Sequence, residues 1–389
     1  MHKQKYTFGS IEKIFYYDWS LLGLIAVLCT IGIIALYSAG QSDCVNGICK
    51  TFGSWTPWAK SQLSKIIAGW IIMLISGLFS PKFFVRFSYI LFVVFLIVLL
   101  IVSISGSIGM GAQRWISIVG FKFQPSELAK ITLILSLSRY FASYNISKVN
   151  SILYILPPII MVSLYVVPIL LQPDLGTALM LIISSGVIFF LSGISWKKFA
   201  VVFLIAGISA PIIWQYGLHD YQKRRIEVFL NPEIESRGAG YHITQSKIAM
   251  GSGGIFGKGY LNGSQSQLNF LPEKHTDFIF TIIAEEFGLI GCTFLLIIYL
   301  MIIYRCFKIS LMVRSQFSKL LVMGLGINFF LYVFINMGMT IGLMPVVGVP
   351  LPFISYGGTA MIVLLFSFGL IQSAYIHKDI LISGKGVYE

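Results

Sequence analysis

Apolar runs of about 20 residues recur along the chain, and this recurrence restricts the possible folds more than any other feature of the sequence. A helix of that length crosses the hydrocarbon core of a bilayer, which is about 30 Å thick. Hydrophobic residues make up 57% of the 389 residues and charged residues only 11%, so an ordinary soluble domain is excluded. A membrane β-barrel would instead show short segments of alternating polarity. The sequence therefore predicts an all-α polytopic membrane protein.

About ten transmembrane helices are expected, each with limits accurate to a few residues. They cover residues 18–40, 60–79, 87–108, 124–142, 152–171, 174–192, 198–216, 278–304, 318–342 and 357–376. An even number of spans places both termini on one side, and the lysines and arginines in the short segments there mark that side as cytoplasmic. The N-terminus shows no cleavable signal sequence. Residues 1–389 are therefore expected to form a single integral membrane domain.

A long segment, residues 217–277, separates the seventh and eighth expected spans. It is rich in lysine and arginine, but long loops cross the membrane regardless of their charge, so we expect it on the extracytoplasmic side. It is also far longer than ordinary connections, which suggests a function. Within it, residues 241–250 are expected to form a short helix on the outer surface, and the glycine-rich residues 251–264 are expected to be mobile.

Polar residues gather at the expected outer ends of the fourth, sixth, eighth and tenth spans. A charge at the edge of a span is costly and needs a reason. Each one alone fits ordinary helix-start chemistry, and Glu127 and Lys130 could simply pair on one helix face. All four groups of polar residues nevertheless lie on the same expected outer side of the membrane, and this favours a shared site. The residues assigned to this site are Arg114, Glu127, Lys130, Asp174, Glu273, His275, Asp277 and Ser355.

Glu285 is treated separately because it follows Asp277 by eight residues inside the same expected helix. At 3.6 residues per turn the two side chains lie within about 80° of one face. Glu285 could line the same cavity at greater depth, or it could be a buried structural partner for a cation. A divalent cation such as Mg²⁺ held through water by Asp277, Glu273 and Glu285 is also left open, although no dedicated oxygen cage is visible.

The charges predict an anionic substrate, since arginine and lysine on the outer side suit phosphate groups. ATP is not expected outside the cytoplasm, so a bond-forming enzyme there needs an activated donor such as a lipid-linked sugar pyrophosphate. The reaction class would be glycosyl transfer, in which a carboxylate takes the proton of an acceptor hydroxyl and cations stabilise the departing pyrophosphate. Asp277 is the candidate base, and its alternative role is that of a helix-start residue favoured by the helix dipole.

Four segments resemble one known family. They read GAQRWISIVGFKFQPSELAK, QPDLGTA, SQSQLNFLPEKHTDFIF and, from Asn336 onward, NMGMTIGLMPVVGVPLPFISYGGTA. They are similar to the corresponding segments of the SEDS proteins (shape, elongation, division and sporulation), and the third is closer to the rod-shape branch than to the division branch. The resemblance extends over essentially all the expected spans. The first outer loop departs from it by its length and by Cys44 and Cys49, whose pairing in a disulfide is left open.

The resemblance implies a ten-span peptidoglycan glycosyltransferase that polymerises lipid II on the outer face of the cytoplasmic (inner) membrane. It implies that Asp277 is essential and that Glu127, Lys130 and Asp174 belong to the outer cavity. The implied partners are a class B penicillin-binding protein, which is a transpeptidase, and the elongation proteins MreC and MreD. Neither an organic cofactor nor a nucleic-acid partner is expected.

Two other function classes remain as alternatives. A lipid II flippase would need a path through both leaflets with alternating access, whereas the polar residues here gather at one face, apart from Glu285 and Glu286. A non-catalytic scaffold of the elongation complex would not depend on Asp277. Polymerisation of purified lipid II by the wild type, and its loss in a variant lacking that carboxylate, would distinguish a polymerase from the two alternatives.

Overall fold

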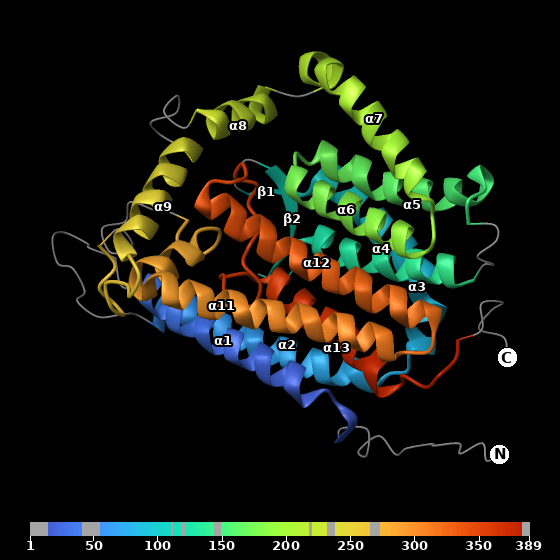
Figure 1. Ribbon diagram of the computed structural model, residues 1–389, viewed down its shortest axis with the longest axis horizontal. Coiled ribbons are helices and arrows are strands. Elements are labelled where there is room, and N and C mark those ends of the chain that lie inside the picture. Colours follow the sequence, from blue (N-terminus) through green and yellow to red (C-terminus); the bar gives the residue numbers. More distant parts are fainter. Residues whose placement is uncertain are drawn as a thin grey trace.

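The computed structural model describes residues 15–40, 55–109, 112–118, 121–143, 149–217, 220–231, 238–264 and 273–382. Cys44 and Cys49 lie outside these residues. Ten of the helices coincide closely with the expected spans (Figure 1). They are α1 (Trp19–Ala39), α2 (Lys60–Leu78), α3 (Pro81–Ser105), α4 (Pro125–Ala142), α5 (Ile152–Leu171), α6 (Leu175–Leu191), α7 (Trp196–Ile212), α11 (Ile279–Met312), α12 (Gln316–Ile341) and α13 (Thr359–Ile376).

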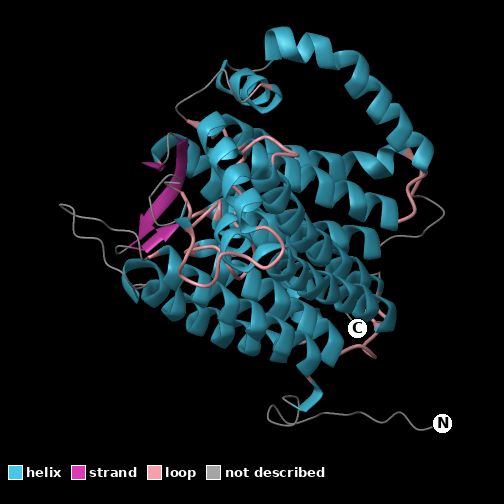
Figure 2. Cartoon of the chain, turned by 60° about the vertical axis from the view of Figure 1, so that its left-hand side comes forward, coloured by secondary structure: helices cyan, strands magenta, loops and turns pink. Residues whose placement is uncertain are grey.

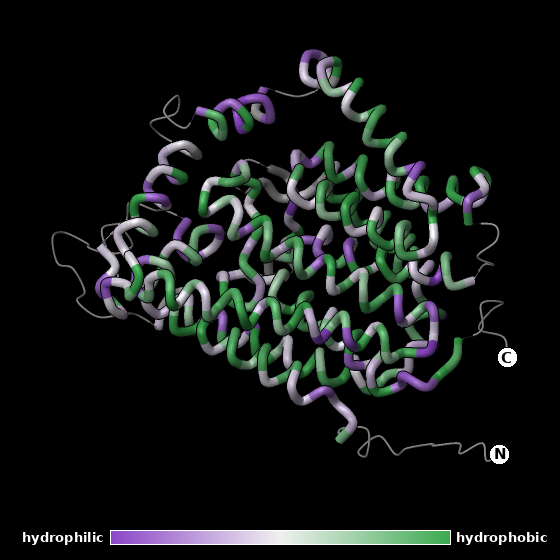
Figure 3. The backbone as a smooth tube through the Cα atoms, viewed as in Figure 1, coloured by the Kyte–Doolittle hydropathy of each residue, from purple (hydrophilic) through white to green (hydrophobic). Residues whose placement is uncertain are grey.

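Within the described residues, seven helices are long and apolar enough to cross a membrane: α1, α2, α3, α5, α11, α12 and α13. Helix α6 is apolar but has only 17 residues. The prediction of an all-α membrane protein is confirmed, and the number of ten spans stays a prediction. Hydrophilic residues are concentrated along α8 (Asp220–Leu230) and near the two chain termini (Figure 3).

Helices α12 and α13 form the centre of the bundle. In the most apolar window of each, 78% and 72% of the residues are buried, against 22% in α3. An apolar side chain that faces outward on α3 is thus suited to contact with lipid, while α12 and α13 contact protein on nearly all sides. A side chain on α12 can therefore bond to several neighbouring elements at once.

A small antiparallel sheet, which the sequence analysis did not anticipate, connects α3 to α4 (Figure 2). It consists of β1 (Ser107–Gly109), β2 (Ala112–Ile118) and β3 (Phe121–Phe123), in the order β1-β2-β3. The seven residues of β2 carry Arg114 and Trp115. The sheet holds Arg114 close to the start of α6, as described below.

The described residues between α7 and α11 include the helices α8 and α9 (Ala239–Gly253). Helix α9 includes the expected outer helix, residues 241–250. No residue of α7 is buried, and in Figure 1 this helix leads away from the bundle toward α8. The chain then returns through α9, which lies beside the start of α11.

The expectation that residues 251–264 are mobile is wrong for the part that follows α9. Its backbone bonds to α11 at four places around Gly288, where α11 has the non-helical angles φ 62° and ψ −159°. The sequence could not show this, because glycine permits both a flexible segment and an unusually close contact between two backbones.

At the end of the bundle that carries the chain termini, one buried ion pair joins α1 to α11. The Asp18 carboxylate receives hydrogen bonds from Arg305 at 2.5 and 3.1 Å, and its side chain is 1% exposed. The Asp18 backbone also bonds to the Gln372 amide of α13 in both directions, at 2.9 and 3.3 Å. The three helices are thus fastened at a single residue.

Replacing Arg305 by methionine should therefore destabilise the fold by about 3–5 kcal/mol, because Asp18 would be left as a buried charge without its partner. Arg314→Met is the matched control: its ion pair with Asp379 is 65% and 72% exposed, so its loss should cost about 0–1 kcal/mol. Thermal unfolding in detergent compares the two variants. Equal losses of stability would contradict the assignment of Asp18 and Arg305 as a structural anchor.

Candidate active site

Three consecutive carbonyl groups fix the turn that carries Asp277, which we call the Asp277 turn (residues 273–278). The His275 carbonyl accepts from the Tyr356 backbone N–H at 2.8 Å, and the Thr276 carbonyl accepts from Ser355 Oγ at 2.6 Å. The Asp277 carbonyl accepts from the Asn336 amide at 2.9 Å. The donors come from α12 and from the loop before α13, so the turn is held from two sides.

Two of these donors are themselves fixed. Asn336, which is fully buried, also donates to the Val349 carbonyl at 2.7 Å. Ser355 Oγ accepts from the Leu351 N–H at 2.8 Å. Asn336 therefore ties α12, the loop and the Asp277 turn together. The sequence analysis did not identify Asn336 as a residue that holds the turn. A polar amide side chain near the end of an apolar span is the feature that could have indicated it.

The turn also has internal bonds that place Glu273 next to Asp277. The Glu273 carbonyl accepts from the N–H groups of Thr276 and Phe278 at 3.2 and 3.3 Å. The Thr276 hydroxyl donates to the Glu273 carboxylate at 3.0 Å. The two acidic side chains are thus held close to each other.

Aromatic rings cover the start of the turn. The Trp58 ring stacks on the His275 ring, with centroids 3.7 Å apart and an interplanar angle of 17°. Tyr356 meets Trp58 edge-on at 5.2 Å, and the Lys65 ammonium lies 3.8 Å from the centre of the Tyr356 ring. The beginning of α2 is therefore part of the wall around the turn, which the sequence analysis did not detect.

The Asp277 carboxylate differs from the other membrane-edge acids in its surroundings. It is partly exposed, and within the described part of the chain it has no ion-pair partner. Burial and the nearby Glu273 raise its pKa from 3.8 to about 7, while the positive charge of Arg225 acts in the opposite direction. Burial lowers the pKa of His275 in the same turn.

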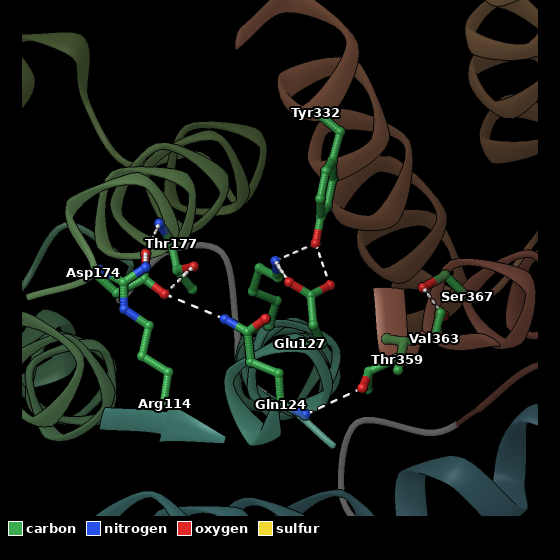
Figure 4. A network of polar contacts seen from close by, with 10 residues as sticks. Arg114, Gln124, Glu127, Asp174, Thr177, Tyr332, Thr359, Val363 and Ser367 are labelled. Carbon is green, nitrogen blue, oxygen red and sulfur yellow. Dashed lines mark hydrogen bonds and ion pairs between the residues drawn. The ribbon is translucent and has the colours of Figure 1, made fainter. Parts of the chain in front are cut away.

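A second polar network lies around the start of α4 and α6 (Figure 4). Asp174 caps α6: it accepts from the Thr177 N–H at 3.2 Å and from the Thr177 hydroxyl at 2.9 Å. Arg114 lies 3.8 Å from the same carboxylate and donates to the Gln172 carbonyl at 3.1 Å and to the Pro173 carbonyl. Gln124 reaches Asp174 at 3.4 Å.

Deeper in this network, Glu127, Lys130 and Tyr332 form a closed triad. The Lys130 ammonium lies 2.8 Å from the Glu127 carboxylate, and Tyr332 bonds to both. All three residues are at most 5% exposed. Tyr332 and Asn336 are one turn apart on α12, so this central helix contacts both the triad and the Asp277 turn.

The structure thus sorts the candidate residues into groups. Glu273, His275, Asp277 and Ser355 meet in or against the Asp277 turn, and Arg114, Glu127, Lys130 and Asp174 meet in the second network. Glu285 belongs to neither: it is fully buried and pairs with Lys258 at 2.8 Å. That pairing is the second of the two alternatives that the sequence left open.

Among the described residues, no group of three or more histidine, cysteine, aspartate or glutamate side chains is arranged to hold a metal ion. Asp277 and Glu273 remain close enough to act on each other, but Glu285 is engaged with Lys258.

Comparison with known proteins identifies the class. The model of the FtsW/RodA/SpoVE family, described as "Cell cycle protein", matches residues 19–380, so the chain belongs to this family. The chain is 40% identical over 326 residues to the peptidoglycan glycosyltransferase MrdB of Escherichia coli K12, which covers 82% of this chain and 86% of that protein. It is 33% identical over 365 residues to the probable peptidoglycan glycosyltransferase FtsW of Trichlorobacter lovleyi, covering 91% and 92%.

Solved structures agree with this assignment. A chain from a peptidoglycan synthase complex that coordinates polymerization and crosslinking superposes with a TM-score of 0.79 at 26% identity, covering 93% of this chain and 98% of the other. An aspartate-to-alanine variant of the Thermus thermophilus rod shape determining protein RodA superposes with a TM-score of 0.68 at 25% identity, with the same coverage. The expected membership in the SEDS family is confirmed.

The raised pKa predicts that Asp277 destabilises the fold at high pH. Between pH 4 and pH 7 the carboxyl ionises in the unfolded chain but not in the folded one, so stability falls as pH rises across this interval. Asp277→Asn should therefore unfold at a higher temperature than the wild type at pH 8, with a smaller difference at pH 5. Thermal unfolding at both pH values checks this, with the exposed Asp220→Asn as control. A variant less stable than the wild type at pH 8 would contradict the prediction.

Proposed function

We propose that this chain is a peptidoglycan glycosyltransferase that polymerises lipid II into glycan strands, with Asp277 as the general base. The observation that carries the proposal is the setting of Asp277: the residue is half-buried, its carboxylate has no ion-pair partner among the described residues, and the turn that bears it is held by bonds to three successive backbone carbonyls. The names of the curated relatives and the resemblance of the HTDF segment support the same activity.

The reaction would be a single displacement. The Asp277 carboxylate accepts the proton of an acceptor sugar hydroxyl while the hydroxyl oxygen forms a bond to the anomeric carbon of the donor. The bond between that carbon and the pyrophosphate oxygen breaks, and the lipid pyrophosphate leaves with its electron pair. The anomeric configuration is inverted. A base with a pKa of about 7 suits this role because about half of it is ionised at pH 7 and its ionised form still accepts a proton well.

The cations of the second network are proposed to act on the donor from the side of α4 and α6. Arg114 is the better placed, since its side chain is 20% exposed, whereas Lys130 is 3% exposed and already paired. Glu127 and Asp174 hold these two cations in position. Glu273, His275 and Ser355 shape the wall around Asp277, and Ser355 does so through the backbone bonds described above.

The membrane arrangement follows from the same proposal. We place the chain as one domain in the cytoplasmic membrane, with both termini in the cytoplasm and the Asp277 turn outside. Residues 217–277 then form the extracytoplasmic segment. The solved synthase complex supports a partner that crosslinks peptidoglycan, a class B penicillin-binding protein, and the family resemblance supports MreC and MreD. A flippase remains the alternative, but the Asp277 turn lies at one end of α11 rather than along a path through the bundle.

The role of Asp277 as the base can be tested by removing its carboxylate. Asp277→Asn keeps the size of the side chain and removes the proton acceptor, so polymerisation should fall by about 10²-fold or more. Purified protein with lipid II and the transpeptidase provides the assay, and Asp220→Asn is the control. Polymerisation by Asp277→Asn at the wild-type rate would exclude the base role.

The second prediction concerns pH. Because the base must be ionised, kcat/KM should rise with pH and reach half its plateau near pH 7. Glu273→Gln removes a neighbouring negative charge and should move this rise to lower pH, whereas Arg225→Gln should move it to higher pH. Shifts in the same direction would contradict the assignment to Asp277. Titratable groups in or against the turn among the described residues also include His275, Lys274, Tyr356 with Lys65 above its ring and, on α9, His242.

A further inference from the structure

Helix α11 is divided at Gly288 into two parts. The first, residues 279–287, is a short helical segment about 13 Å long, and it begins two residues after Asp277. The second part crosses the rest of the membrane. The carboxylate proposed as the base therefore immediately precedes a short helical segment that a backbone break at Gly288 separates from the long span.

The glycine-rich residues after α9, 253–259, complete the hydrogen bonding at this break. In the membrane interior an unpaired backbone N–H or C=O costs several kcal/mol, so a broken helix needs such partners. The bonds run from the N–H groups of Lys258, Gly259, Leu289 and Ile290 to the carbonyls of Glu285, Glu286, Gly254 and Ile255, at 3.0, 3.0, 3.0 and 3.2 Å.

The two backbones approach so closely that only glycine fits between them. A Cβ atom on Gly257 would lie 2.1 Å from the Glu286 carbonyl oxygen, and one on Gly288 would lie 2.4 Å from the Gly257 nitrogen. A Cβ atom on Gly253 would lie 2.2 Å from the Ala284 carbonyl oxygen. The contact is thus a close fit of main chain against main chain, in contrast to a flexible linker.

Side-chain interactions add to this backbone contact. The Lys258 ammonium lies 2.8 Å from the Glu285 carboxylate, and Ser264 bonds to both, at 2.7 and 3.1 Å. Glu285 is fully buried, and a buried charge persists only with a partner. The neighbouring Glu286 bonds to Ser38 of α1. The lower end of the short segment is therefore anchored on two sides.

The same stretch of chain also contacts the upper part of the short segment. Ser246 of α9 lies 2.7 Å from the Thr281 hydroxyl and donates to the Thr340 carbonyl of α12 at 2.9 Å. In Figure 1, α9 and the loop that follows it lie along the beginning of α11. Residues 239–264 thus contact the segment below Asp277 near both of its ends.

We propose that Lys258 and Glu285 are positioning residues, and that residues 239–264 set the place of Asp277 by holding the short segment of α11 from its far end. This inference rests on the proposed function. A helix of two to three turns moves as a rigid unit, so a shift at Glu285 is passed to the Asp277 turn. A misplacement of about 1 Å is enough to slow an enzyme by roughly 10²-fold.

The test uses the full chain in lipid nanodiscs and a neutral replacement of the pair, Lys258→Gln with Glu285→Gln. We expect hydrogen exchange in residues 273–282 to be about tenfold faster, kcat to fall by about 10- to 100-fold, and the rise of activity with pH to move to lower pH as water reaches Asp277. The charged groups that act on Asp277, Glu273 and Arg225, are unchanged, and so are the groups that interact with Glu273 or lie beside it, His242, His275 and Lys274.

The matched control is Asp18→Asn with Arg305→Gln, which neutralises the ion pair between the start of α1 and the part of α11 beyond Gly288. It should lower the unfolding temperature but leave both the exchange of residues 273–282 and the pH of half-maximal activity unchanged. Equal effects of the two double variants would overturn the proposal, as would wild-type exchange and pH profile in the first.

Two single variants cover the case in which the neutral pair does not fold. Lys258→Arg keeps the charge and should restore the wild-type pH profile, while Ser264→Ala keeps the ion pair and should produce the same changes at smaller size. The proposal would be overturned if Ser264→Ala had wild-type hydrogen exchange and pH profile while Lys258→Arg did not have the wild-type pH profile. Hydrogen exchange in residues 273–282 reports on the position of the Asp277 turn and does not depend on polymerisation. If Asp277→Asn polymerises normally, the proposed function fails, but the exchange measurement still tests this inference.

Discussion

Hydrogen bonds to three successive carbonyl oxygens hold the turn that carries Asp277, and the geometry of the candidate site depends on them. Their donors come from α12 and from the loop before α13, which are distant from the turn in sequence. Because backbone carbonyls accept these bonds, the Asp277 side chain remains unengaged by them. The turn is rigid while its carboxylate stays available, which is the combination that a general base requires.

The structural acids and the candidate base differ in burial and in whether a cation lies beside them. Asp18, Glu127 and Glu285 are buried and each has a lysine or arginine within hydrogen-bonding distance. Such pairs are strongly destabilised when one partner is removed. Asp277 is partly exposed and has no such partner among the described residues, and the neighbouring Glu273 disfavours its ionised form. Because the pKa of Asp277 is raised, its ionised form costs stability, and this cost falls at the site where chemistry is proposed.

Helix α12 organises both polar regions because it is buried on nearly all sides. Tyr332 bonds to the Glu127 and Lys130 pair, and Asn336, one turn away, bonds to the Asp277 turn. The two regions are therefore placed relative to each other by a single rigid helix. The short segment of α11 and the glycine-rich loop provide the remaining support from the opposite end.

The sequence by itself determined the helical membrane fold, the approximate places of the helices and the identity of Asp277 as a polar residue at the start of a span. Two limits differed more widely, since α3 begins at Pro81 and not at 87, and α11 ends at Met312 and not at 304. These features are local, since the length and polarity of a segment report directly on its burial. Only the tertiary structure decided which groups pair: Asn336 with the Asp277 carbonyl, Lys258 with Glu285, and Trp58 with His275. It also showed that a glycine-rich stretch expected to be mobile is bonded to a helix break. Partner choice depends on which helices meet, and this is set by the packing of the whole bundle rather than by any segment alone.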